Sequence, residues 1–267
     1  MKKFLASVLT AAMALSLAVI APAAPAFAAE SGTETQQETS SGQTDQISLN
    51  YKDLIASPGQ KFTLKLNGVK KGSKVKYKTT KKSVASVSQK GKVKIKKTGT
   101  VYSKAVYKKK TYKCRIRVYS KKKAANVYAK TMAKYIKKNC KKDSDRLLAA
   151  SYAVMSGFQY GNHYTAEDLF YYGSGTCVAG SKMVAKILNY MGYKAKCRFA
   201  AKDKMSRYPQ GIMFGSDHHN VQVKVKGKTY YVDGNPGMPM VYLTTSKKPI
   251  YYEIGGWGVI TDERNGF

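Results

Sequence analysis

Residues 218–233 read HHNVQVKVKGKTYYVD, and this stretch has the pattern of a β-hairpin. Its first half alternates polar residues with three valines, as in a strand that buries one face: Val221, Val223 and Val225. Gly227 follows at the position of a tight turn, and a second run, TYYVD, comes shortly after it. A two-residue turn at 226–227 pairs Val225 with Lys228 and so fixes the register of both strands.

The register decides which side chains of the hairpin share a face. It places Asn220 opposite Asp233, and both lie on the face away from the valines. His218 is on that face as the diagonal neighbour of Asp233, at a Cβ separation of about 7 Å, within reach of an imidazole–carboxylate hydrogen bond. His219 falls on the valine face, where we expect it to pack or to donate a hydrogen bond that supports the site from outside. A bulge here would exchange the two histidines, and an ordinary surface His–Asp pair is the alternative without function.

A second stretch, GSGTC at residues 173–177, precedes apolar residues at helical spacing: Val184, Ile187, Leu188 and Met191. The spacing predicts a helix from Cys177 to the glycine at 192. A helix N-terminus and a neighbouring imidazole lower the pKa of a thiol, and free backbone N–H groups there can hold an oxyanion. Cys177 also lies on the buried stripe of the helix, so an inert core cysteine is the alternative.

The other cysteines and the third histidine are weaker candidates. Cys114 and Cys197 fall in predicted strands, and Cys140 ends a lysine-rich helix. A disulfide between Cys140 and Cys197 stays open. His163 is isolated and is expected in a loop. Because no C-x-x-C or H-x-x-x-H spacing occurs, we expect neither a metal site nor a cofactor.

The N-terminal residues have the composition of targeting and linker segments. Residues 1–28 combine two early lysines, an apolar run broken by prolines and a final A-x-A, which predicts a secretory signal peptide. The prolines break the run before it reaches the length of a membrane span, so no transmembrane segment is expected after cleavage. Residues 29–46 are polar and predict a flexible linker.

Residues 47–120 differ sharply in pattern from the C-terminal half of the chain. Short alternating runs separated by glycines predict six or seven strands and a small β-sandwich. From residue 121 onward, helices are expected over 121–140, 143–158, 166–171 and 177–191, with an Asp143-Ser144-Asp145 cap on the second. Strands are expected near 195–200, 220–226 and 229–232, so this part has an α+β pattern.

Positive charge is concentrated in the first of these parts. The chain has a formal net charge of +33, from 48 Lys or Arg and 15 Asp or Glu. Residues 51–142 hold 31 of the basic residues and a single acid, a net of +30. Nearly all are lysines, whereas proteins that read bases favour arginine. The pattern therefore favours a diffuse polyanion, such as an anionic cell-wall polymer, over specific nucleic acid; solvation of a small domain explains only part of it.

Two family resemblances can be read from these residues. Residues 82–118 resemble the second half of a bacterial immunoglobulin-like (group 2) domain, on a skeleton of Val84-Ala85, Val87, Gly91, Val93, Gly99 and Ala105. Residues 122–240 resemble the transglutaminase-like superfamily, on Gly173, Gly175, Cys177, His218, Val223, Val225, Gly227, Tyr230, Val232 and Asp233. The family usually has Trp where Asn220 stands and Pro-Thr where Gly234-Asn235 stand.

The resemblances imply an immunoglobulin-like sandwich over 47–120 and a papain-like α+β domain over 121–267. They imply a secreted, envelope-associated cysteine enzyme that acts on peptide or isopeptide amides, peptidoglycan peptides among them, with Cys177, His218 and Asp233 as its site. Hydrolysis and transamidation both stay open. The alternative is a catalytically inactive relative that serves as a basic wall-binding or adhesive module. Because chemistry and anchoring fall on different parts of the chain, we expect Cys177 to react normally without residues 47–120.

Overall fold

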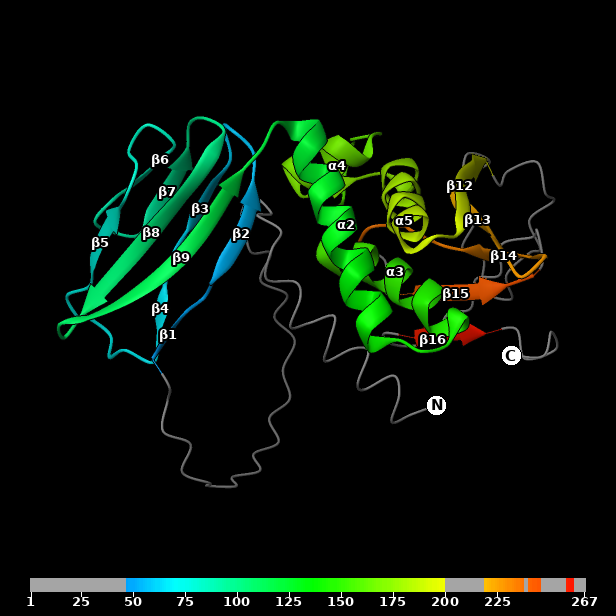
Figure 1. The fold of residues 1–267 in the computed structure, drawn as a ribbon, viewed down its shortest axis with the longest axis horizontal. Coiled ribbons are helices and arrows are strands. Elements are labelled where there is room, and N and C mark those ends of the chain that lie inside the picture. The colour runs from blue at the N-terminus through cyan, green and yellow to red at the C-terminus, as the bar shows by residue number, and fades with distance from the viewer. Residues whose placement is uncertain (1–46, 200–218, 238–239, 246–257, 262–267) are drawn as a thin grey trace, which may run out of the picture.

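The computed structural model describes residues 47–199, 219–237, 240–245 and 258–261. Over these residues the chain is a mixed, sheet-rich protein with four helices (Figure 1). Strands β1–β9 come first, a group of helices with two short strands follows, and strands β12–β16 come last. The signal peptide and linker predicted over 1–46 lie outside the described residues.

The first part consists of two facing sheets. Their strand orders are β2-β9-β8-β5 and β3-β7-β6, with a short β1-β4 pair beside them. Side chains alternate along the long hairpin β8-β9, so that Val101 and Ile116 point into a core that both sheets share. The strands are β1 (Ser48–Leu49), β2 (Asp53–Ala56), β3 (Lys61–Thr63), β4 (Leu66–Asn67), β5 (Lys76–Thr79), β6 (Ala85–Val87), β7 (Lys92–Ile95), β8 (Gly99–Tyr107) and β9 (Lys110–Val118).

The expected number of six or seven strands in this part was too low, and the alternation of Phe62, Leu64 and Leu66 shows why. These residues do not belong to one strand. Phe62 is in β3, which pairs with β7, whereas Leu66 is in β4, which pairs with β1. Leu64 lies between the two strands, is fully buried, and donates its N–H to the Gly91 carbonyl at 2.9 Å. Every second residue stays at least partly buried although the chain passes from one sheet to another. The sequence shows this alternation of burial but not the change of pairing partner, so two strands looked like one.

The helices begin and end close to the predicted residues. They are α2 (Lys121–Asn139), α3 (Asp143–Gly157), α4 (Ala166–Tyr172) and α5 (Cys177–Met191). The expected Asp143 cap was wrong: Lys142 is the N-cap residue of α3, and Asp143 lies in the first helical turn, where its charge still favours the helix N-terminus. Gly192 ends α5 in the left-handed conformation, with φ of 101°, as predicted for a C-terminal glycine.

The second sheet has the order β12-β13-β14-β15-β16. Its strands are β12 (Lys194–Phe199), β13 (His219–Val225), β14 (Lys228–Val232), β15 (Met240–Thr244) and β16 (Gly258–Thr261). The predicted hairpin register is confirmed, since Val225 pairs with Lys228 across a turn in which Lys226 and Gly227 have φ of 48° and 84°. The valines of β13 join the core around α5, so α5 covers the valine face of the sheet (Figure 1).

The two parts of the chain share a packed interface along β2. Leu54 and Ala56 point into the core of the strands, whereas Ile55, only 1% exposed, belongs to the core of the helical part. The Gln60 side chain donates to the Tyr171 carbonyl oxygen at 2.7 Å, and the Tyr171 hydroxyl donates to the Pro58 carbonyl oxygen at 3.1 Å. Residues over 100 positions apart are thereby joined at the end of α4.

Within the described ranges, no helix is long and apolar enough to cross a membrane.

Candidate functional site

Cys177 is the first residue of α5 and is half-buried. The loop before it depends on its two glycines. Gly173 ends α4 with φ of 74°, the left-handed conformation that glycine adopts without strain. Gly175 has no room for a side chain, because an added Cβ would lie 2.8 Å from the Cβ of Ala179. The two glycines of the GSGTC pattern therefore let the chain turn after α4 and pack closely before α5, so that Cys177 is the first residue of that helix.

A short strap, residues 159–164, lies beside this loop and fixes it. Strand β10 (Gln159–Tyr160) pairs in parallel with β11 (Ser174–Gly175). Both the N–H and the hydroxyl of Thr176 donate to the His163 carbonyl oxygen, at 2.9 and 3.2 Å. In the part of the chain that the structure describes, the Thr176 side chain makes no capping bond to α5. The first amides of α5 are thus not occupied by that hydroxyl, which suits them to an oxyanion.

His163 lies in a loop, as predicted, but it has specific partners, so the expectation that it is isolated was wrong. Its ring stacks on Tyr172 with centroids 4.1 Å apart and an interplanar angle of 11°. Its Nδ1 lies 3.4 Å from the Ser174 hydroxyl. Sequence spacing gave no sign of this role, because the contacts join the strap to the end of α4. His163 supports the loop that carries Cys177.

The first turns of α5 pack tightly against the hairpin of β13 and β14. Ser181, one turn after Cys177, is buried and donates its hydroxyl to the His219 carbonyl oxygen at 3.1 Å. Gly180 faces the segment after β14, and an added Cβ there would lie 1.7 Å from the Gly234 carbonyl oxygen. The start of β13 and the end of β14 therefore both meet the N-terminal half of the helix that carries the thiol.

Asp233 is at this junction and is 3% exposed. Its Oδ1 accepts hydrogen bonds from the N–H groups of Gly234 and Asn235, at 2.7 and 3.0 Å. Its backbone carbonyl accepts the hydroxyl of Ser151, from α3. These bonds fix the orientation of a buried carboxylate, which is what an acid that orients an imidazole requires.

Of the two candidate histidines, the structure describes only His219. His218 lies outside the described residues, so its part in the site stays a prediction. His219 is half-buried, with its ring centroid 5.0 Å from that of Phe199. Alternation along β13 places His219 on the valine face, and that face is the one that α5 covers. The valine face, where His219 was expected to pack or to act as a supporting donor, is thus the face nearer to the helix that carries the thiol.

Asn220 shows what the opposite face of β13 does. Its side-chain oxygen accepts from Arg198 Nε at 2.9 Å, and the Arg198 guanidinium lies 4.6 Å from the centre of the Tyr231 ring. Asn220 is fully buried. It therefore serves a polar cluster between β12, β13 and β14 at the position where the transglutaminase-like pattern has Trp.

The other three cysteines are less suited to nucleophilic chemistry. Burial raises the pKa of Cys114 to about 12, with a further contribution from the Asp53 charge. Burial also raises the pKa of Cys140 and of Cys197. The Cys177 charge adds to the raised pKa of Cys197. All four cysteines are free, so the structure contains no disulfide between Cys140 and Cys197.

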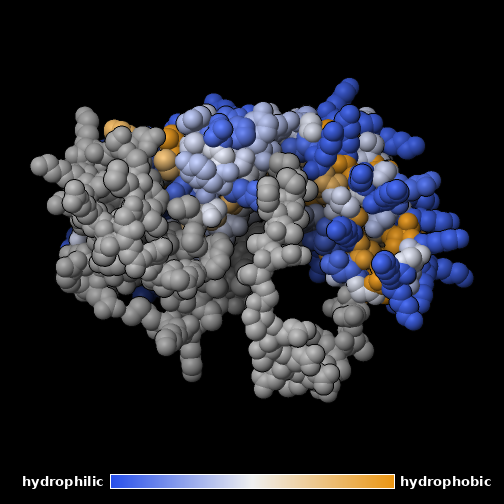
Figure 2. All heavy atoms as spheres, turned by 180° about the vertical axis from the view of Figure 1, so that it is seen from behind, coloured by the Kyte–Doolittle hydropathy of each residue, from blue (hydrophilic) through white to orange (hydrophobic). Residues whose placement is uncertain are grey.

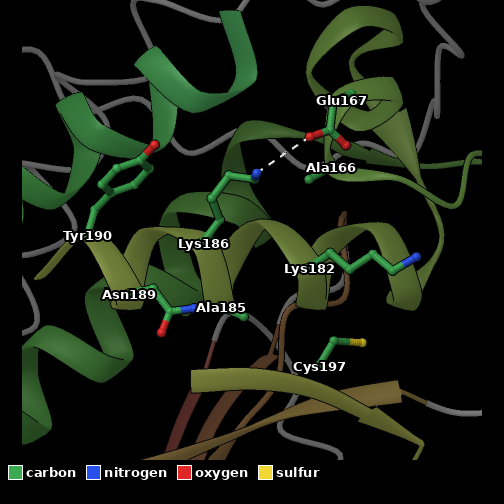
Figure 3. A pocket seen from close by; sticks show the side chains of 8 residues that line it. All are labelled: Ala166, Glu167, Lys182, Ala185, Lys186, Asn189, Tyr190 and Cys197. Atoms are coloured by element: carbon green, nitrogen blue, oxygen red, sulfur yellow. Dashed lines mark ion pairs between the residues drawn. The ribbon is translucent and has the colours of Figure 1, made fainter. Parts of the chain in front are cut away.

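A pocket of about 500 Å³ runs along α5, with Cys197 as the one cysteine among its lining residues (Figure 3). Within it, Lys186 pairs with Glu167 at 3.5 Å, and Lys182 donates to the Tyr164 carbonyl oxygen at 3.0 Å. The pocket is lined by Ala166, Glu167, Lys182, Ala185, Lys186, Asn189, Tyr190 and Cys197. Among the described residues, no group of three or more His, Cys, Asp or Glu could hold a metal ion.

Comparison with known proteins gives only partial similarities. No family model matches this chain, and no curated protein matches it. An intimin mutant of EHEC O157:H7 is 25% identical, with a TM-score of 0.21, over 24% of this chain and 34% of that one. The S-layer protein rSbsC(31-844) is 22% identical, with a TM-score of 0.24, over 28% of this chain and 13% of that one. Domains 4 and 5 of the S-layer protein SbsC are 22% identical, with a TM-score of 0.23, over 28% of this chain and 52% of that one. Similarities this small and partial carry no argument about function.

Proposed function

We propose that this chain is a secreted, envelope-associated cysteine enzyme that acts on peptide or isopeptide amide bonds through a thioester, with Cys177 as nucleophile. The observation that carries the proposal is the convergence of three segments at one junction. The thiol begins α5, the start of β13 meets α5 at Ser181, and the buried carboxylate of Asp233 follows β14. Nucleophile, imidazole strand and orienting acid are the parts that such chemistry needs.

The proposed reaction has two steps. In the first, the Cys177 thiolate attacks the amide carbonyl, the C–N bond breaks, and an imidazolium gives its proton to the leaving amine. In the second, water or an amine attacks the thioester carbonyl, the imidazole takes the proton of the attacking group, and the thiolate leaves. Water as acceptor gives a peptidase or amidase, and a lysine amine gives a cross-link. The uncapped first turn of α5 would stabilise the oxyanion in both steps.

We extend this proposal to the fold of each part and to the location of the protein. The helical part would be a transglutaminase-like, papain-like domain, and the strands of residues 47–120 an immunoglobulin-like module. The sequence features that support secretion are the signal-peptide pattern and the cluster of lysines. The lysine-rich module would hold the enzyme against an anionic cell-wall polymer, near the peptide amides that it acts on.

The second candidate is a protein of the same fold that binds without catalysis. The observation that favours it is Asn220, which is occupied by Arg198 where the resembled family has Trp. In that case the junction around Cys177 would be only a packed core.

A thiol-reactive probe separates the two candidates. The mature protein is treated with iodoacetamide at pH 7, and the label is located by peptide mapping. An enzyme should label at Cys177 at least ten times faster than at the other three cysteines, whose pKa values burial raises. Slow and equal labelling of all four would contradict the enzyme.

Matched variants then identify the imidazole. His218→Ala and His219→Ala are compared separately, with His163→Ala as the control for loss of a supporting histidine. The variant that slows labelling of Cys177 without changing the unfolding midpoint removes the partner of the thiol. Incubation with wall fragments and peptide libraries, followed by mass spectrometry, tells hydrolysis from amine transfer.

A further inference from the structure

One face of the β-strand part carries a row of lysines that no strand pattern requires. Lys104 on β8 pairs directly with Lys78 on β5 and with Lys113 on β9. Residues that are directly opposite in an antiparallel sheet share a face, so the three ammonium groups project from the same side. We call Lys78, Lys104 and Lys113 the lysine row. Hydrophilic side chains project from this half of the molecule, with hydrophobic residues visible between them (Figure 2).

The domain supplies almost no negative charge to balance the row. Asp53 is the only acidic residue in positions 47–120. Its carboxylate is engaged at the other edge of the same sheet, where it binds Arg115 and, at 3.0 Å, Arg117. Beyond it, Ile55 is covered by the helical part. Asp53 therefore offsets only part of the charge of the two arginines, and no other acidic residue of positions 47–120 is present to balance the lysine row.

Like charges directly opposite each other destabilise a sheet. Cβ atoms of such pairs are about 5 Å apart, and two such pairs in succession place the charge of Lys104 between two others. Lys78 and Lys113 are exposed and Lys104 is half-buried, so an outside anion can reach all three. An anion that bridges them would relieve the repulsion, and one with regularly spaced charges would do so along the whole row.

We infer that the lysine row binds a linear phosphate polymer that lies across strands β5, β8 and β9. The inference rests on the proposed anchoring function of this module and names its ligand class and contact residues. Strand spacing of about 4.8 Å sets the ammonium groups in a line, so successive phosphates can each meet a lysine. Lysine acts as a point charge toward phosphate, whereas planar, bidentate recognition calls for arginine.

The test measures binding of the full mature protein to fluorescent inorganic polyphosphate at 0.1 M salt. The row variant carries Lys78→Gln, Lys104→Gln and Lys113→Gln. A matched control carries Lys70→Gln, Lys90→Gln and Lys92→Gln, three exposed lysines that lie outside the row, so both variants lose the same charge. The row variant should weaken binding at least tenfold and the control no more than about threefold, with a shallower salt dependence for the row variant alone.

Thermal unfolding gives a second measurement. Polyphosphate should raise the Tm of the wild type and of the control, but not that of the row variant. Without polymer, the row variant should be at least as stable as the wild type at low salt, because the repulsion is gone. This also shows that any loss of binding is not a loss of folding.

The outcomes separate the inference from the proposed function. Equal weakening by both variants would overturn the row and leave a diffuse charge field that still anchors. No binding to polyphosphate by any form would overturn the anchoring function as well, while Cys177 labelling tests the enzyme independently. Stronger binding to polyglutamate or to duplex DNA, at equal charge concentration, would overturn the phosphate polymer as ligand.

Discussion

Replacing Gln60 with alanine should loosen the loop that carries Cys177, although the two residues belong to different parts of the chain. Gln60 is 6% exposed, and its amide donates to the Tyr171 carbonyl oxygen at 2.7 Å. Its Oε1 accepts from the Ser57 N–H at 2.8 Å. Tyr171 is in the last turn of α4, directly before the GSGTC loop, so Gln60 completes the end of that helix from outside.

The magnitude can be worked from the bonds that are lost. Gln60→Ala removes the bonds with Tyr171 and Ser57, each with a net contribution of about 1 kcal/mol, and a long, weak bond to the Phe170 carbonyl oxygen at 3.5 Å. It also leaves the Tyr171 carbonyl at a buried interface without this donor, at a cost of about 1 kcal/mol more. The total is about 3 kcal/mol of unfolding free energy. Roughly 2 kcal/mol of it should fall on the end of α4, which corresponds to about a thirtyfold rise in local opening.

Hydrogen exchange of the amides of residues 169–177 measures this opening directly, and urea unfolding measures the total. Asn50→Ala is the matched control, because Asn50 also makes two side-chain bonds, to the Thr63 carbonyl oxygen and the Lys65 N–H, but far from α4. It should lower stability by about 1–2 kcal/mol and leave exchange at α4 unchanged.

Faster exchange at α4 in Gln60→Ala alone would mean that the strand module positions the nucleophile. The sequence-based expectation that Cys177 reacts normally without residues 47–120 would then fail. If both variants lower stability but neither changes exchange at α4, the interface holds the two parts together without stabilising the end of α4. That result would refute the predicted effect of Gln60 on the Cys177 loop.

Three further predictions concern single residues. Gly180→Ala places a Cβ 1.7 Å from a backbone oxygen after β14 and should cost about 3 kcal/mol or prevent folding, whereas Gly157→Ala, with its nearest contact at 3.7 Å, should cost little in urea unfolding. Burial raises the pKa of Cys114 to about 12, so peptide mapping should find it unlabelled by iodoacetamide through pH 9. The Tyr193 hydroxyl, with nearby cations, lowers the pKa of Asp143, so the stability from this carboxylate is present above about pH 4 and is lost as pH falls through the lowered pKa. Thermal unfolding should show a smaller acid loss for Asp143→Asn than for the wild type; an equal loss would contradict this.

The sequence determined the features that depend on neighbours along the chain. Helix α5 starts at Cys177 and ends at Gly192 because apolar spacing and a left-handed glycine are local properties. The register of the β13–β14 hairpin is set by alternating valines and a turn in which both residues have positive φ. In each case the hydrogen bonds that decide the structure join residues only a few positions apart.

Tertiary structure alone decided which surfaces meet. Alternation separates the two faces of β13 but does not say which face α5 covers. The hairpin pattern therefore could not predict that His219 lies on the face toward the helix of Cys177. The contact between Gly180 and Gly234 and the bond from Gln60 to Tyr171 likewise join elements that only packing brings together. A sequence pattern records whether a side chain is buried; its partner depends on how whole elements pack, and that is set by the entire core at once.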